Sequence, residues 1–263
     1  MDKKKRRRRQ RRLDAAVAAI QRRYGPWALS RARSAGAAAT TGDRVVPHIP
    51  TGLPALDAAL GIGGLPRGTM CELVGPATAG KTVLALRFLA QAQAGGGQVG
   101  YIDQALYFDA DDARRCAVDL ARLVVGTPHD LAEALAASEA LVHSGELAAL
   151  VFDAFGFLWT DPQAAAQLTA MLDRLLPALA RSGTTLLFLH ESSDDDSPAF
   201  LALDHYAAVR LRVARERWLE HLGDVRGYAA RVEVLKNRAA PGPLPSPVTI
   251  SVEFDGPVTG DGL

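Results

Sequence analysis

The central part of the chain alternates between short apolar runs and amphipathic segments. Apolar runs of strand length lie at 69–74, 98–103, 122–126, 148–153 and 184–190. Apolar residues recur at helical spacing in the intervening segments, at 81–95, 110–120, 130–144 and 163–181. Runs that are apolar along their whole length, such as 186–189, are typical of parallel strands buried on both faces. The pattern therefore predicts an α/β fold with a mostly parallel central sheet flanked by helices.

The last quarter of the chain follows a different pattern. Apolar and polar residues alternate along 209–213, 231–234 and 248–254. A period of two indicates strands with one face in water. We expect these segments to form antiparallel strands at the C-terminal end of the sheet.

The region before residue 46 does not share the strand–helix alternation. Leu13, Val17 and Ile20 recur at helical spacing before the Gly-Pro pair at 25–26, which predicts one short helix. Residues 30–44 are rich in Ala, Gly, Ser, Thr and Arg, as in linkers. The predicted organisation is a disordered basic tail at 1–12, a helix and linker at 13–45, and a core at 46–263.

The first twelve residues carry most of the charge asymmetry of the chain. Their net charge is +8, which leaves about −7 on the other residues. A dense basic block can bind nucleic acid by releasing counterions from phosphates. Single-stranded DNA is the candidate ligand, and the candidate contacts are Lys3, Lys4, Lys5, Arg6, Arg7, Arg8 and Arg9. Two alternatives stay open, a tail that only aids solubility and a tail foreign to the native protein.

Composition excludes some classes of protein. The 263 residues include 48% hydrophobic and 22% charged residues, which is ordinary for a globular α/β domain. No apolar run approaches the length of a membrane span, and the chain does not start with an apolar signal core. Cys71 and Cys116 have no metal-like spacing and are expected to be buried or half-buried thiols in a reducing compartment. We expect a cytoplasmic protein with no membrane partner.

The segment from Gly75 to Thr82 matches the phosphate-binding pattern G-x-x-x-x-G-K-[ST]. It lies between a predicted buried strand and a predicted helix, as this loop requires. Backbone N–H groups and the helix N-terminus would bind phosphate oxygens, Lys81 would reach the β- and γ-phosphates, and Thr82 would ligate Mg²⁺. The predicted cofactor-binding residues are Gly75, Pro76, Ala77, Thr78, Ala79, Gly80, Lys81 and Thr82, and the cofactors are ATP and Mg²⁺.

Two further residues follow from this assignment. Asp153 ends an apolar strand and is the candidate second ligand of Mg²⁺, through water, unless it only caps the next turn. Outside the tail the chain uses lysine only at Lys81 and Lys236, although it has 25 arginines. A compact ammonium fits among phosphates better than a guanidinium, so Lys236 is also a candidate nucleotide contact.

These motifs resemble the bacterial recombinase RecA family over nearly the whole of 46–256. The matching segments are 51–61, 63–68, 75–82, 101–103, 152–153, 206–211 and 234–241. The resemblance implies that Lys236 and Arg238 reach the ATP of a neighbouring protomer, and that Asp109 is the acidic residue near the adenine. It also implies that the helix at 13–24 docks on a neighbouring protomer, so a homo-oligomer is expected.

Departures from the family pattern affect the chemistry of the site. Ala105 stands where the family has the glutamate that activates water, and Asp112 stands where it has the tyrosine that stacks on adenine. The Asn-Gln pair that senses the γ-phosphate is replaced by His190-Glu191. Loss of a general base typically slows a reaction about 10²- to 10⁴-fold. Lys81 is retained, and Glu191 is either a substitute catalytic base or the remnant of a strand end.

The DNA-binding parts of the family also differ here. The first loop, after 159–162, is short, and the second, 192–198, carries three consecutive aspartates. An acidic loop repels the phosphates of DNA. His205 replaces a phenylalanine of the filament interface, and the small C-terminal domain of the family is not expected after Leu263.

The residues together predict a diverged RecA-like protein that binds ATP and hydrolyses it slowly or not at all. The resemblance is to accessory proteins of recombination and of SOS or translesion mutagenesis, of which the ImuA type is one. The partner would be a translesion polymerase component or RecA itself. Two alternatives stay open: an active DNA-dependent ATPase that forms filaments on single-stranded DNA, and a protein-interaction module with a relic nucleotide site.

Overall fold

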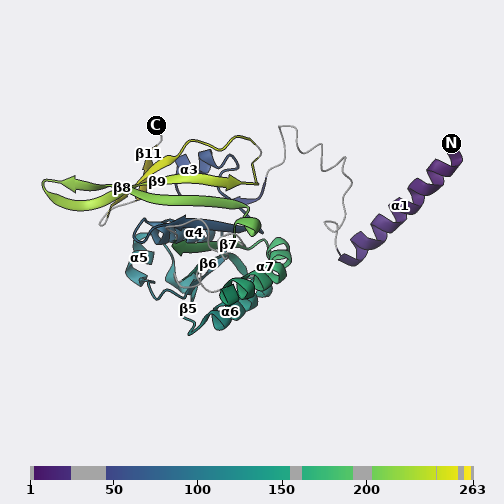
Figure 1. Cartoon of the computed structure of the whole chain (residues 1–263), viewed down its shortest axis with the longest axis horizontal. Helices are drawn as coiled ribbons and strands as arrows, with labels where there is room; N and C mark the ends of the chain where they lie inside the picture. The colour runs from purple at the N-terminus through teal and green to yellow at the C-terminus, as the bar shows by residue number, and fades with distance from the viewer. Residues whose placement is uncertain are drawn as a thin grey trace. The chain divides into compact units, whose positions relative to one another are not determined.

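The computed structural model describes residues 3–24, 46–154, 162–191, 203–240, 242–253 and 258–261. The chain divides into two compact units, Met1–Val45 and Val46–Leu263. The first unit contains helix α1 (Lys3–Tyr24) (Figure 1). The helix predicted at 13–24 therefore starts ten residues earlier, and the tail expected to be disordered is largely helical. Arg, Lys and Gln are good helix formers, and their propensity favours a helix despite the repulsion between like charges.

The second unit is built on a nine-stranded sheet with the order β11-β10-β9-β8-β3-β7-β6-β4-β5. Six neighbouring strands, from β8 to β5, pair in parallel, whereas β8, β9, β10 and β11 pair antiparallel. The strands are β3 (Met70–Gly75), β4 (Gln98–Asp103), β5 (Leu123–Gly126), β6 (Leu147–Asp153), β7 (Thr185–Glu191), β8 (Val209–His221), β9 (Asp224–Asn237), β10 (Val248–Glu253) and β11 (Val258–Asp261). The predicted fold class is confirmed.

The α-helices of this unit range in length from 6 to 21 residues. They are α3 (Pro54–Ala59), α4 (Lys81–Ala94), α5 (Ala110–Arg115), α6 (Leu131–Ser144) and α7 (Pro162–Ser182). The predicted helix at 110–120 was too long, because α5 is capped at Cys116 and Ala117 adopts a positive φ of 65°. A short 3₁₀ turn, Leu120–Arg122, follows before β5.

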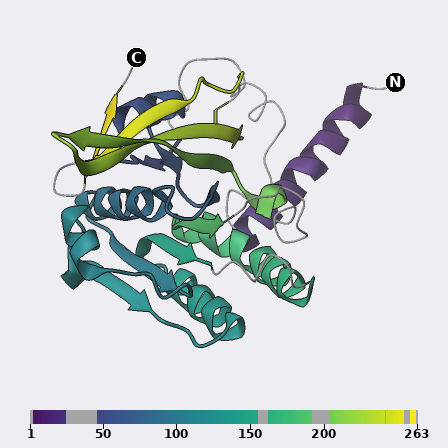
Figure 2. The ribbon, with the colours of Figure 1, turned by 60° about the vertical axis from the view of Figure 1, so that its left-hand side comes forward.

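Two hydrophobic cores cover the two faces of the parallel strands. Residues of β3, β4, β6 and β7 alternate between them, so that Leu187 packs with α3 and α4 whereas Leu186 and Phe188 pack with α6 and α7. Figure 2 shows α4 on one side of these strands and α6 and α7 on the other. This arrangement explains the continuous apolar runs in the sequence. Cys71 and Cys116 are buried and free, as predicted.

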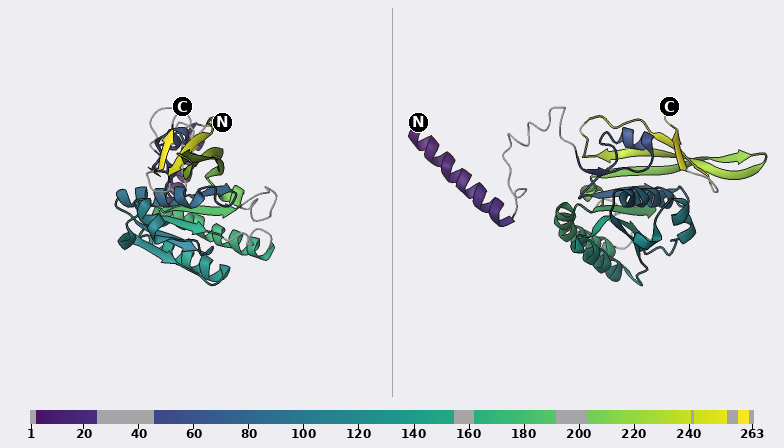
Figure 3. Two further views of the ribbon diagram at one scale, coloured as in Figure 1. Left: turned by 90° about the vertical axis from the view of Figure 1, so that its left-hand side faces the viewer. Right: turned by 180° about the vertical axis from the view of Figure 1, so that it is seen from behind.

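The antiparallel end of the sheet curls over α4. The inward residues of β9 are Tyr228, Ala230, Val232 and Val234, and all of them belong to the core that contains α4. β8 and β9 form a long hairpin whose turn projects beyond the rest of the sheet (Figure 3). A separate two-stranded sheet joins β1 (His48–Ile49) to β2 (Leu65–Pro66). Within the described ranges, no helix has both the length and the apolarity of a membrane span.

Candidate functional site

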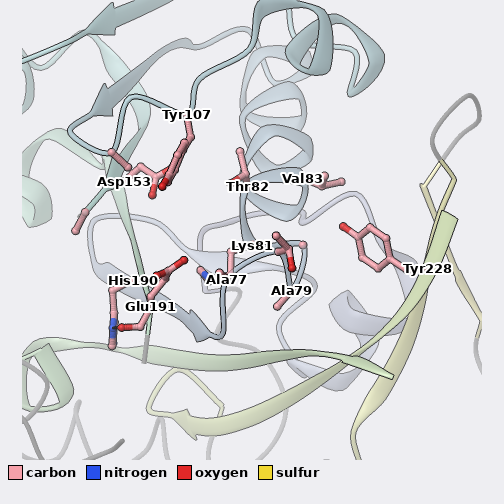
Figure 4. A pocket seen from close by; sticks show the side chains of 14 residues that line it. Ala77, Ala79, Lys81, Thr82, Val83, Tyr107, Asp153, His190, Glu191 and Tyr228 are labelled. Atoms are coloured by element: carbon pink, nitrogen blue, oxygen red, sulfur yellow. Dashed lines mark hydrogen bonds between the residues drawn. The ribbon is translucent and has the colours of Figure 1, made fainter. Parts of the chain in front are cut away.

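A cavity of about 790 Å³ lies where the parallel strands β3, β4, β6 and β7 end. In open α/β sheets this carboxyl edge is the usual place for a ligand. The loop from β3 to α4 supplies the residues from Ala77 to Val83, and the ends of β6 and β7 supply Asp153 and Glu191 (Figure 4). Of the predicted phosphate-loop residues, all but Gly75 and Pro76 line this cavity.

The glycines of the loop are required by the β8–β9 hairpin packed against it. A Cβ atom on Gly75 would lie 2.0 Å from the carbonyl oxygen of Val213 on β8. Gly80 has φ of 101°, and a Cβ atom there would lie 2.7 Å from the Tyr228 hydroxyl on β9. Gly80 also caps the N-terminus of α4, so the free N–H groups of the first helical turn face the cavity.

Lys81 is held in the wall of the cavity by its own loop. Its ammonium donates to the carbonyl oxygens of Gly75 at 2.9 Å and Pro76 at 2.7 Å. Burial lowers the pKa of Lys81, and the carboxylates of Glu191 and Asp153 oppose that shift. Gly75 and Pro76 thus act by positioning the lysine. The arrangement places one buried cation among the backbone donors of the loop.

Asp153 and Thr82, the two predicted Mg²⁺ ligands, are brought together by a residue that the sequence analysis missed. The hydroxyl of Tyr101, a fully buried residue of β4, donates to Asp153 Oδ2 at 2.5 Å. Thr82 also hydrogen-bonds the Tyr101 hydroxyl. Burial raises the pKa of Asp153 to about 6, against the hydrogen bond from Tyr101. A buried carboxylate beside a hydroxyl is a donor set that suits a divalent cation shared with phosphates.

Comparison with known proteins agrees with this geometry. The family model for the RecA N-terminal domain matches residues 11–255. Protein RecA of Streptomyces coelicolor is 35% identical over 253 residues, covering 87% of this chain and 65% of the relative. Protein RecA of Rubrobacter xylanophilus is also 35% identical, over 87% of this chain and 71% of the relative. The chain belongs to the RecA family. It spans about two thirds of the length of the Streptomyces protein.

The position of the RecA-family glutamate, Ala105, lies on the cavity wall and is 8% exposed. The nearby carboxylate of Asp103 is not among the described residues of the cavity lining, and its two oxygens accept the backbone N–H groups of Tyr107 at 3.0 Å and Phe108 at 2.9 Å. Glu191, at the end of β7, is therefore the remaining carboxylate of the cavity lining besides Asp153.

His190 lines the cavity but its ring is turned into the sheet. Its Nε2 lies 2.8 Å from Glu72 Oε1, and its Nδ1 lies 3.1 Å from the carbonyl oxygen of Glu191. Glu72 is fully buried in the middle of β3 and also accepts from Arg210 of β8. The structure thus separates the roles of the His190-Glu191 pair: the imidazole is engaged by Glu72, and Glu191 faces the cavity (Figure 4).

The family resemblance assigns Asp109 to the adenine, and Lys236 and Arg238 to the ATP of a neighbouring protomer, and all three assignments stay predictions. Asp109 caps α5 by accepting from the backbone N–H groups of Asp111 and Asp112. Lys236 donates to the backbone carbonyl and the carboxylate of Asp204. Arg238 is exposed on the surface. None of the three is among the described residues that line the cavity.

Several predicted contacts cannot be placed. The side chains of Lys3 to Arg9 and the loops at 159–161 and 192–198 lie outside the described residues. Two tyrosines of the cavity wall were not foreseen, Tyr107 after β4 and Tyr228 on β9. Tyr228 shares the inward face of β9 with Ala230 and Val232, but an alternating pattern indicates burial and not a place in the cavity wall.

Proposed function

We propose that this RecA-family chain binds ATP and Mg²⁺ at the cavity between β3, β6 and β7. The observation that carries the proposal is the position of Lys81, buried beside the phosphate loop and within the electrostatic reach of Asp153 and Glu191. Thr82 and Asp153 would hold Mg²⁺, which neutralises phosphate charge when bound. The protein's own contribution is to fix a cation, a set of N–H donors and a carboxylate around one cavity.

We propose further that hydrolysis is weak or absent. The general-base position is Ala105, and Asp103 is engaged by backbone N–H groups. Glu191 adds negative charge where the γ-phosphate would lie, which weakens binding of the very group to be transferred. Nucleotide would then fix a conformation or an interface and would be turned over slowly.

The biological role we propose is that of an accessory factor in recombination or in SOS or translesion mutagenesis. Its support is the combination of a RecA-family core with an altered catalytic position and an acidic segment at 192–198. The proposed protein partner is RecA or a component of a translesion polymerase. Single-stranded DNA would bind to the basic residues of α1, and Arg238 would reach a neighbouring protomer in a homo-oligomer.

Hydrolysis in the presence and absence of single-stranded DNA tests this proposal. We expect slow phosphate release that DNA does not stimulate. Ala105→Glu restores a carboxylate to the cavity wall and should raise the rate by about tenfold or more. Ala105→Gln is the matched control, because it adds similar bulk without a base.

An active DNA-dependent ATPase is the second candidate, and the cavity-facing carboxylate of Glu191 favours it. This candidate predicts phosphate release that rises with single-stranded DNA and is lost in Glu191→Gln. The accessory-factor proposal predicts little change in Glu191→Gln, or a gain in ATP affinity, since a repulsive charge is removed.

A further inference from the structure

The cavity has two ends with different chemistry. Asp153 and Glu191 lie at one end, and Lys81 lies between them and the opposite end (Figure 4). At that opposite end the wall is formed by Val83 and the ring of Tyr228, whose hydroxyl points toward the phosphate loop (Figure 4). Tyr228 is only 7% exposed, yet it borders the cavity.

The direction in which a nucleotide would lie follows from these two ends. The γ-phosphate and the metal belong beside Lys81, Thr82 and Asp153, where the cation and the carboxylate are. The phosphate nearest the sugar then lies along the first turn of α4, beside Val83, because the chain of phosphates follows the loop. The sugar and the base must continue away from Asp153, toward Tyr228.

We propose that Tyr228 is the aromatic platform for the base of the bound nucleotide. This inference rests on the proposed function and deepens it, since it assigns the base-binding part of the same site. The ring of Tyr228 lines this end of the cavity, and nucleotides commonly stack on aromatic side chains whichever base they carry.

The surroundings of Tyr228 hold its ring in place. The indole of Trp218 on β8 meets it edge-on, with ring centroids 6.3 Å apart and an interplanar angle of 89°. The guanidinium of Arg215 lies 4.1 Å from the centroid of the Trp218 ring and also donates to the Thr78 hydroxyl at 3.3 Å. The hairpin thus links the platform to the phosphate loop itself. Burial raises the pKa of Tyr228 to about 12, further above physiological pH than that of a free phenol, so the ring carries no charge.

The other candidates for a base platform are placed less well. Asp112 stands at the position of the family's stacking tyrosine, and its carboxylate pairs with Arg115 on the exposed side of α5. Tyr107 borders the cavity, but it lies beside Asp153, at the end that the γ-phosphate would occupy (Figure 4). Among the described residues of the cavity wall, Tyr228 is therefore the aromatic residue at the end away from Asp153.

Calorimetric titration with ATP and with inorganic tripolyphosphate separates the base contact from the phosphate contact. Tyr228→Leu keeps an apolar side chain but removes the ring, and it should weaken ATP binding about tenfold while tripolyphosphate affinity stays within about twofold. Tyr228→Phe should bind ATP nearly as the wild type does. Tyr107→Leu is the matched control and should not lose ATP affinity selectively.

The remaining outcomes contradict the inference in different ways. Equal losses for both ligands in Tyr228→Leu would mean that the residue only supports the phosphate loop. Unchanged ATP affinity, or a selective loss in Tyr107→Leu instead, would place the base elsewhere. A wild-type protein that binds neither ligand would refute the proposed function, and the assignment of Tyr228 with it. Binding of tripolyphosphate as tightly as ATP would refute the base platform alone.

Discussion

At the scale of single residues, the proposed metal ligand is held in an unfavourable state. Asp153 is 7% exposed, and its pKa is raised to about 6 because burial disfavours its charge. Tyr101 donates one hydrogen bond to it, and Asp103 and Glu191 add like charge nearby. Functional sites commonly lower the folding stability of a protein in this way. The charge of Asp153 therefore serves binding and works against folding.

Asp153→Asn should stabilise the nucleotide-free protein at pH 7.5 by about 1 to 3 kcal/mol, because the amide carries no buried charge. A carboxyl whose pKa is raised on folding contributes its full stability below the unfolded value near 3.8 and loses it as the pH rises through about 6. The difference in the free energy of unfolding between Asp153→Asn and the wild type should thus be small at pH 4 and close to its full value by pH 7. Urea unfolding across this pH range measures it.

The control for this prediction is Asp130→Asn. Asp130 caps α6 and is exposed, and asparagine caps helices about equally well, so little change is expected. If Asp153→Asn is less stable than the wild type at pH 7.5, the interactions of the wild-type carboxylate outweigh the cost of burying its charge.

At the scale of elements, three parallel strands are tied together by a buried polar cluster. Glu72 in β3 binds His190 of β7 and Arg210 of β8, and Arg210 also binds Asp204 at 2.8 Å. Lys236 of β9 joins the same Asp204. The cluster runs from the edge of the cavity to the lysine that the family resemblance assigns to a neighbour's nucleotide. Lys236 is thereby held by its own chain.

Glu72→Gln should destabilise the protein by about 3 kcal/mol, because it removes the buried charge partner of Arg210 and leaves the guanidinium only the half-exposed carboxylate of Asp204. Glu233→Gln is the matched control on the neighbouring strand. Its partner Arg212 is 3.8 Å away, and both side chains are about 40% exposed, so the loss should stay below about 1 kcal/mol. If chemical unfolding shows that Glu72→Gln and Glu233→Gln lose equal amounts of unfolding free energy, the cluster has no special role in stability.

The sequence predicted these elements unevenly, for physical reasons. The strand at 98–103 was placed correctly, and the one at 148–153 within one residue, because strands buried on both faces leave an uninterrupted apolar run. The end of α5 was missed because the reversal at Ala117 has no glycine to mark it. Glu72 could be noticed as an acid inside an apolar strand, but its partners lie 118 and 138 residues away in sequence.

The site was predictable where the chemistry is local. The loop, its lysine and the strand-end Asp153 follow from short motifs, and all of them meet at one cavity. Tyr101 and Tyr228 could not be assigned to it, because their contacts with the loop depend on how β4 lies beside β6 and how the β8–β9 hairpin curls over α4. Asp109 matched a family motif and its carboxylate also caps α5, so its contact with adenine stays a prediction.

At the scale of the whole molecule, charge is divided between the two units. The first unit carries a net charge of +11, of which +8 lies in residues 1–12, and the second unit carries −10. Binding of nucleic acid would therefore be concentrated in the first unit. Nucleotide binding would depend on the second unit, in which all the cavity residues lie.

Deleting residues 1–12 should remove most affinity for single-stranded DNA, together with its steep salt dependence, because that dependence reflects phosphates neutralised by basic side chains. The variant should bind ATP as the full chain does. Fluorescence anisotropy of a labelled oligonucleotide at several salt concentrations measures the first effect. Undiminished DNA binding would place the DNA contact in the core.

The most direct measurement of the central claim is the thermal stability of the full chain with and without ATP and Mg²⁺. A ligand at about a hundred times its dissociation constant adds about 2.7 kcal/mol, which should raise the Tm by roughly 5 °C or more. Lys81→Ala should abolish the rise, and Arg174→Ala, on the exposed side of α7, should keep it. If ATP leaves the Tm of the wild type unchanged, or protects Lys81→Ala equally, the phosphate loop of this chain does not bind nucleotide.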